Sequence, residues 1–152
     1  MEIVILPVET ITHTISSDNM GKIIINVDYT DNFAATPANE DIACVSTGRT
    51  FEELKKNMEE ALHWHIDSMR EDGEPVPAEF EGKWELEWSM SVRALLHYIE
   101  KLVPKSAIAK ATGINQQQLT HYASGYRVPR PEMRTRIING IHRIASQLSA
   151  IS

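Results

Sequence analysis

A run of polar residues after Gly113 has the types and spacing for specific hydrogen bonding. The stretch "GINQQQLTHY" places three glutamines and a threonine in the first turns of an expected helix. A glutamine amide can donate to and accept from adenine, and threonine can meet a polar base edge or the thymine methyl group. The exposed face of this helix is expected to carry Gln116, Gln117, Thr120 and His121. The pattern favours a DNA-reading face over the alternative, a glutamine-rich face that contacts only solvent.

A tight turn must position this polar helix. Gly113 is expected between two helices that meet at a steep angle, because glycine adopts a positive φ without strain. Ala109 is small enough to let the helices approach, and Asn115 is placed to cap the second helix. The apolar residues expected to pack beneath the turn and along the inner face are Ile114, Leu119 and Tyr122.

The remaining candidates for chemistry are acids and histidines of the N-terminal half. A two-metal nuclease site needs several converging carboxylates, but Asp28, Asp31 and Asp41 are expected at strand ends and turns, where solvated acids are common. His63 and His65 are two residues apart on an expected helix, so they cannot chelate one metal as an i, i+4 pair could. The sequence predicts no catalytic residue, no metal site and no cofactor.

The net charge of −6 conceals two halves of opposite sign. Residues 1–90 contain 6 Lys and Arg against 19 Asp and Glu, a net −13, whereas residues 91–152 contain 9 against 2, a net +7. An acidic unit attracts basic partners and a basic one attracts phosphate backbones, so we expect two units with two kinds of partner. The alternative is that the halves neutralise each other within one body.

Length and composition exclude several protein classes. A chain of 152 residues with 42% hydrophobic content can bury a core as one domain or two small ones. Its apolar runs are too short to span a membrane and its N-terminus lacks the pattern of a signal peptide, so the protein is expected in the cytoplasm. The single cysteine, Cys44, is interpreted as a small buried apolar residue.

The expected elements give an α+β protein. Alternating apolar residues predict strands in "KIIINVDY", "DNFAAT", "DIACVST" and "KWELEWSM", with a long helix starting after Thr50 before the last of them. Thr50 and Glu53 have capping-box spacing, and Gly73 marks the end of that helix. Residues 91–152 are expected to form four to five helices. The domains are therefore an extension at 1–21 that could add an edge strand, a β-β-β-α-β unit at 22–90 and an all-α unit at 91–152.

The N-terminal unit resembles the HicB family of antitoxins, whose domain is described as a degenerate RNase-H-like or double-stranded-RNA-binding-like fold. The resemblance covers roughly residues 22–90. Its matching positions are Cys44, Gly48, Thr50, Glu52, Glu53, Leu54, Asp72, Gly73 and Pro77. The chain departs from the family at Ile42 and Ala43, where Pro-Gly is common, and in the extension before the first strand.

Residues 92–148 resemble the helix-turn-helix domains of the Cro and lambda-repressor type. The matching positions are Ala109, Gly113, Ile114, Leu119, Tyr122, Gly125, Pro129 and a closing helix from Pro131 that carries Ile137, Ile141, Ile144 and Leu148. The resemblance implies that Gln116, Gln117 and Thr120, with His121 beside them, meet base edges.

The same resemblance implies a set of contacts to DNA phosphates. The residues expected there are Lys105, Ser124, Tyr126, Arg127 and Arg130. Arg130 replaces the serine that usually caps the last helix, so it costs some capping and adds a charge. Arg134, Arg136 and Arg143 are left open between phosphate contact and simple solvation.

The two resemblances together imply an antitoxin of a HicAB-type system that also represses its own operon. The acidic unit would neutralise a small basic HicA-like toxin that cleaves RNA, and the basic unit would bind a double-stranded DNA operator as part of a homodimer or tetramer. One alternative is a stand-alone transcriptional regulator whose N-terminal unit only oligomerises or senses a ligand. Another is a nuclease that retains RNase-H-like chemistry.

Overall fold

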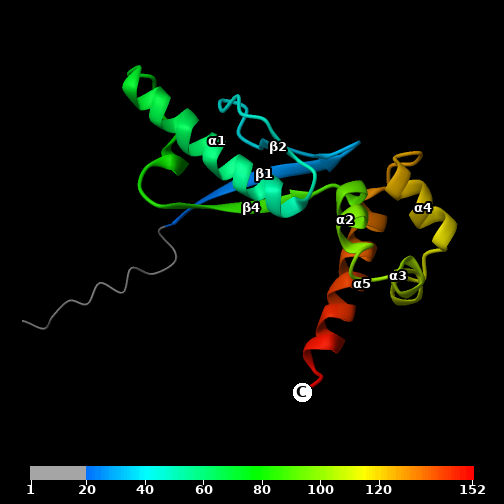
Figure 1. Ribbon diagram of the computed structural model, residues 1–152. Coiled ribbons are helices and arrows are strands. Elements are labelled where there is room, and N and C mark those ends of the chain that lie inside the picture. Colours follow the sequence, from blue (N-terminus) through cyan, green and yellow to red (C-terminus); the bar gives the residue numbers. More distant parts are fainter. Residues whose placement is uncertain (1–19) are drawn as a thin grey trace, which may run out of the picture.

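The computed structural model describes residues 20–152. The predicted extension, residues 1–21, lies outside the described residues except for its last two, and so does the edge strand suggested for it. The fold is α+β, as predicted, with a four-stranded mixed sheet and five α-helices. Figure 1 shows the sheet and one long helix at one end of the molecule and the other four helices at the opposite end.

The element order from residue 21 to residue 90 is the predicted β-β-β-α-β. The elements are β1 (Gly21–Tyr29), β2 (Phe33–Pro37), β3 (Ser46–Gly48), α1 (Phe51–Glu71), the short 3-10 helix η2 (Ala78–Phe80) and β4 (Trp84–Met90). Four helices follow: α2 (Val92–Ile99), α3 (Lys105–Thr112), α4 (Gln116–Ser124) and α5 (Pro131–Ser149). No helix within residues 20–152 is long and apolar enough to cross a membrane.

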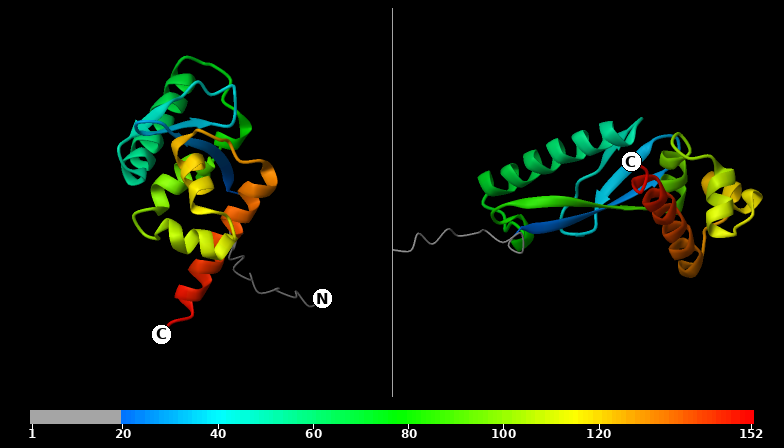
Figure 2. Two further views of the ribbon diagram at one scale, coloured as in Figure 1. Left: turned by 90° about the vertical axis from the view of Figure 1, so that its right-hand side faces the viewer. Right: turned by 90° about the horizontal axis from the view of Figure 1, so that it is seen from below.

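The sheet has the strand order β3-β2-β1-β4. β1 and β2 are antiparallel neighbours, whereas β4 returns after α1 and pairs parallel to β1. The alternating residues Ile23, Ile25 and Val27 of β1 are buried, because they face the long helix. Figure 2 shows α1 lying along one face of the sheet, with the α2–α5 helices gathered at one end of the strands.

Helix α1 begins where the capping-box spacing predicts. Thr50 Oγ1 accepts a hydrogen bond from the Glu53 backbone N–H at 3.1 Å. The Glu53 carboxylate accepts from the Arg49 N–H at 3.1 Å, one residue earlier than in the standard capping box. The helix ends at Glu71, two residues before Gly73, and its buried stripe is Leu54, Met58, Leu62 and Ile66. This stripe covers the sheet.

The third strand is shorter than the sequence predicted. "DIACVST" alternates from Asp41 onward, but β3 contains only residues 46–48. The preceding backbone bonds to itself, with the Ile42 N–H donating to the Asn39 carbonyl and the Cys44 N–H to the Ile42 carbonyl. Because these groups are satisfied locally, residues 41–45 do not extend the ladder with β2.

The buried apolar residues form two clusters, and α2 contributes to both. The first lies between the sheet and α1 and includes Ala94 of α2. The second lies among the α2–α5 helices and includes Val92, Leu96 and Ile99 of the same helix. Tyr98 packs its ring edge-on against Phe51 at 5.2 Å between centroids. One short helix therefore joins the two cores.

Cys44 is buried, as predicted, and burial raises the pKa of its thiol. Because the folded pKa is raised, the thiol's contribution to stability is present at neutral pH and is lost as the pH climbs above the unfolded value, near 9.0. We expect Cys44→Ala to remove that part of the alkaline loss of stability, measured by urea unfolding between pH 7 and 10. Equal pH profiles for the two proteins would contradict this expectation.

Candidate nucleic-acid interface

Gly113 forms the turn between α3 and α4 in the predicted left-handed conformation. Its φ is +69°, and its N–H donates to the Ala109 carbonyl at 2.8 Å. Thr112, the buried polar residue beside it, donates its hydroxyl to the Ile108 carbonyl at 2.7 Å and accepts from the Ile114 N–H at 3.2 Å. The turn is thus held by side-chain and backbone hydrogen bonds, and Ile114 is buried beneath it.

Helix α4 presents the predicted polar face to solvent. Asn115 is its N-cap, with the side-chain oxygen accepting from the Gln117 N–H at 2.7 Å. Leu119 and Tyr122 are buried as predicted. Gln116 and Gln117 are exposed, as is Thr120 one turn later. The buried side anchors the helix, so the polar side chains have a fixed platform.

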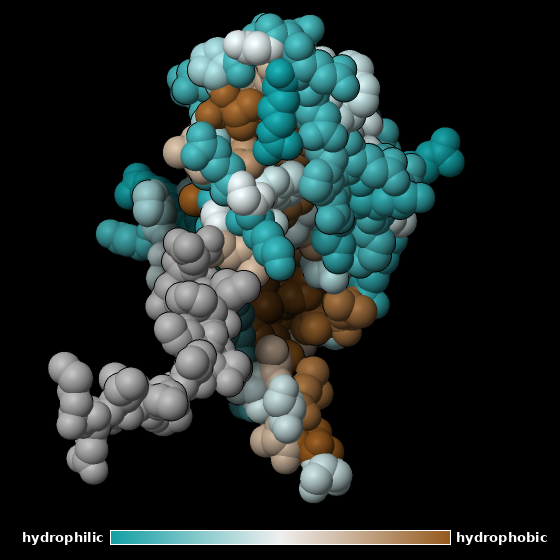
Figure 3. All heavy atoms as spheres, turned by 90° about the vertical axis from the view of Figure 1, so that its left-hand side faces the viewer, coloured by the Kyte–Doolittle hydropathy of each residue, from teal (hydrophilic) through white to brown (hydrophobic). Residues whose placement is uncertain are grey.

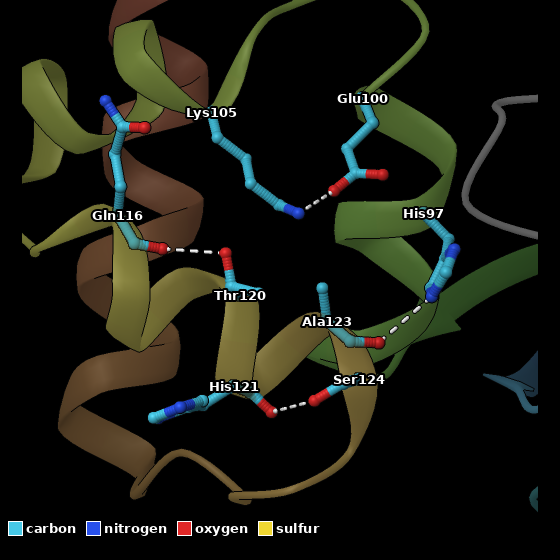
Figure 4. Close-up of polar contacts among 8 residues, drawn as sticks. All are labelled: His97, Glu100, Lys105, Gln116, Thr120, His121, Ala123 and Ser124. Carbon is cyan, nitrogen blue, oxygen red and sulfur yellow. Dashed lines mark hydrogen bonds and ion pairs between the residues drawn. The ribbon is translucent and has the colours of Figure 1, made fainter.

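Two of the four predicted base-contacting residues make contacts within the protein. The Thr120 hydroxyl donates to the Gln116 carbonyl at 3.0 Å, as Figure 4 shows, which leaves its methyl group and oxygen lone pairs free. His121 is half-buried, and its ring lies against that of Tyr126 with 4.9 Å between centroids. Gln116 and Gln117 are therefore the two predicted base-contacting residues whose side chains are exposed and make no hydrogen bond within residues 20–152. The third glutamine, Gln118, instead donates to the Tyr122 hydroxyl at 2.7 Å.

Most predicted phosphate-contacting residues lie together in the loop after α4. Tyr126, Arg127 and Arg130 are exposed. The Ser124 hydroxyl donates to the His121 carbonyl at 3.1 Å and accepts from the Tyr126 N–H at 3.3 Å, so it orders the loop. Arg130 occupies the N-cap position of α5 without a side-chain capping bond, as the missing serine predicts.

Lys105 is the exception among these residues. Its Nζ lies 2.5 Å from Glu100 Oε1, and both side chains are about one-third exposed or less. Figure 4 shows the lysine directed across the gap between α3 and α2 toward that carboxylate. Lys105 must therefore break or share this ion pair before it can reach a phosphate.

The arginines of α5 have a role that the sequence did not indicate. Arg136 Nε donates to the Thr112 carbonyl at 2.7 Å, and Arg143 Nη2 donates to the Ala111 carbonyl. Both acceptors are at the C-terminal end of α3, where helix carbonyls lack internal partners. Arg134 Nη2 donates to the Met90 carbonyl at 2.9 Å. The seven-residue spacing of Arg136 and Arg143, two helical turns, is the signal that would have placed them on one face.

Arg93 is a further cation near the site that the sequence pattern did not indicate. Its guanidinium lies against Gly125, at the C-cap of α4, and its Nε is the one buried side-chain polar atom without a hydrogen-bond partner among residues 20–152. A charged group at the base of the loop adds to the positive field there.

The candidate acids Asp28, Asp31 and Asp41 lie apart, in local hydrogen bonds or exposed turns. Asp28 accepts from the Ser91 hydroxyl at 2.6 Å and from the Tyr29 N–H, so it fixes the start of α2. Asp31 and Asp41 are exposed in turns, as expected. His63 packs its ring on Trp84 at 4.5 Å between centroids. Within the described residues, no three His, Cys, Asp or Glu side chains are close enough to hold a metal ion.

Comparisons with known protein families, curated proteins and solved structures found no match.

Proposed function

We propose that the protein is a HicB-like antitoxin of a HicAB-type system and represses its own operon by binding operator DNA through α4. The N-terminal unit would bind a small basic toxin that cleaves RNA. The main support for DNA binding is the exposure of the Gln116 and Gln117 amides in the first turn of α4, directly after its N-cap. The opposite side of the helix is held in the core by Leu119 and Tyr122.

The surroundings of that face support binding to duplex DNA. A recognition helix enters the major groove with its N-terminal residues at the base edges, and the flanking loop contacts the backbone. Here the exposed cations Arg127 and Arg130 follow α4 directly, within a segment of net charge +7. One module of this size covers a modest site, so useful specificity needs two copies on half-sites about 34 Å apart.

The DNA half is tested by selecting binders from random duplexes and measuring their dissociation constants as a function of salt. We expect an enriched palindromic site, with affinity that falls steeply as the salt concentration rises. If all duplexes are retained equally, the protein binds DNA through its positive charge without reading the sequence. If no duplex is retained, the proposal is wrong.

Binding to a toxin is supported by the net charge of −13 of residues 1–90. This charge is complementary to the basic surface expected of a protein that binds RNA. Affinity capture of the tagged protein from its host, eluted at low and high salt, tests it. We expect a stoichiometric small basic protein. Recovery of only DNA and further copies of the chain would support the stand-alone regulator instead.

Lys105 gives a quantitative test of the phosphate contacts. Lys105→Ala is expected to weaken binding to all sequences alike and to lower the slope of log affinity against log salt by about 1. Glu100→Gln removes the ion-pair partner of Lys105, so we expect tighter binding to every sequence.

The matched control for this pair is Glu132→Gln. Glu100 and Glu132 are the two acids among residues 91–152, and Glu132 has no ion pair with Lys105. If both glutamate variants raise the affinity equally, the gain comes from net charge alone and Lys105 is not a phosphate contact.

A further inference from the structure

The outer edge of β4 is unpaired within residues 20–152. β4 is the last strand of the order β3-β2-β1-β4. Its odd-numbered residues direct their backbone toward β1, since the Gly21 N–H donates to the Lys83 carbonyl and the Ser91 N–H to the Val27 carbonyl. The N–H and C=O groups of Trp84, Leu86 and Trp88 therefore point away from the sheet, because backbone direction alternates along a strand.

Arg134 marks the end of this free edge. Its guanidinium donates to the Met90 carbonyl at 2.9 Å, which confirms that even-numbered residues face outward and occupies the last acceptor. Beyond it, a groove of about 380 Å³ lies between β4 and α5 and is lined by apolar side chains that include Trp88, Leu95, Ile138 and Ile141. Figure 3 shows apolar residues gathered in a hollow beside the C-terminal helix, below a largely hydrophilic surface.

The two faces of β4 differ in chemistry. Trp84, Leu86 and Trp88 are half-buried on the face toward α1. Glu85 and Glu87 are exposed on the opposite face, next to Lys22 and Ile24 of β1, respectively. Glu87 therefore has no basic neighbour in register on β1. A strand added to this edge would be favoured if it were apolar on one face and basic on the other.

We propose that the β4 edge binds an extended segment in which Lys or Arg alternates with apolar residues, supplied by the basic partner of the proposed function. The incoming strand would pair with residues 84–88, place its basic side chains beside Glu85 and Glu87, and seat an apolar side chain in the groove against Ile138 and Ile141. The identity of that partner rests on the proposed function.

Charge disfavours the two other occupants. Antiparallel pairing of two β4 strands centred on Leu86 or Glu87 sets glutamate opposite glutamate, and like charges across strands are destabilising. Residues 1–19 contain Glu2, Glu9 and Asp18 and no Lys or Arg, so the chain's own N-terminal residues offer no complementary charge.

A synthetic peptide tests the proposal without the natural partner. The probe is Lys-Val-Lys-Val-Lys-Val-Lys, titrated into the full-length protein and followed by the backbone amide NMR signals. We expect saturable binding, with the Leu86 and Trp88 amides shifted and slowed in hydrogen exchange and those of Glu85 and Glu87 little changed. A peptide with Glu in place of Lys should not bind. Neither should a peptide that is N-methylated at every second residue, on the amides that would pair with β4.

Two variants and one matched control separate the contribution of charge from that of backbone pairing. Glu87→Lys should weaken the basic peptide at least tenfold, whereas Glu59→Lys makes the same charge change on the exposed face of α1 and should leave binding unchanged. Leu86→Pro removes a backbone N–H that points away from the sheet and makes no ladder hydrogen bond to β1. The variant should therefore stay folded but lose binding of the peptide.

Several results would overturn the inference. They are an absence of binding, equal losses for Glu87→Lys and Glu59→Lys, or Leu86 and Trp88 amides already protected in the free protein. If these amides are protected in the free protein and the protection depends on protein concentration, a second copy occupies the β4 edge. If the protection does not depend on concentration, residues 1–19 occupy it. A partner that is captured by both the wild type and Glu87→Lys would leave the antitoxin function standing and reject only this edge as its site.

Discussion

Gly140→Val is expected to lower the free energy of unfolding by about 2–3 kcal/mol, the upper part of the range for overpacked cores. Gly140 is buried in α5, and a Cβ built on it would lie 2.4 Å from Thr112 Cγ2 of α3. The helices can approach this closely only because the glycine has no side chain. Urea unfolding followed by circular dichroism measures the effect.

A double-mutant cycle gives the control for this prediction. Gly140→Ala keeps the clash with a smaller side chain, and Thr112→Ser removes the Cγ2 methyl group while retaining the hydroxyl that bonds to the Ile108 carbonyl. We expect the double variant to be more stable than the sum of the single effects predicts, because the two residues are in contact. Strict additivity would show that the close approach is not what requires glycine.

The double variant Gln116→Ala, Gln117→Ala is expected to lose most sequence discrimination. Each bidentate contact to a base contributes about 1–3 kcal/mol, so losing both costs about 2–6 kcal/mol on the selected site. Binding to scrambled duplex should hardly change, because phosphate contacts carry no sequence information. Titrations of the selected and scrambled duplexes at one salt concentration measure the ratio.

Two other glutamines provide matched controls. Gln147→Ala alters an exposed glutamine near the end of α5, and Gln118→Ala removes the amide that bonds to the Tyr122 hydroxyl. Neither should change the specificity ratio. If Gln147→Ala lowers discrimination as much as the double variant does, α4 is not the reading helix.

Local patterns in the sequence predicted most of the elements and the exposed face of α4. The Thr50 cap, the Leu54 to Ile66 stripe, the Gly113 turn and the Asn115 cap all depend on residues within a few positions of one another. Their energetics are local, so spacing alone is informative. The exposure of Gln116 and Gln117 followed from the burial of Leu119 and Tyr122 on the opposite side.

Contacts between residues far apart in the sequence could not be predicted from local patterns. The parallel alignment of β4 with β1 joins residues about sixty positions apart, and the alternation of β4 is the same for either strand direction. The bonds from Arg136 and Arg143 to α3 depend on how two helices cross, and the Lys105–Glu100 pair depends on the loop between α2 and α3. The shortened β3 reflects backbone bonds that side-chain periodicity does not report.

The position of α2 in both cores gives the two ends of the molecule one shared element through which binding at one end could act on the other. His97 of this helix stacks on Tyr29 of β1 at 3.9 Å between centroids and donates to the Ala123 carbonyl of α4 at 3.0 Å. In the proposed function, a ligand of the sheet that shifts α2 would therefore change the free energy of docking α4 into DNA. By linkage, DNA must change the affinity of that ligand by the same factor. Under the proposed function, occupancy of an operator and occupancy of the sheet would form a single coupled equilibrium.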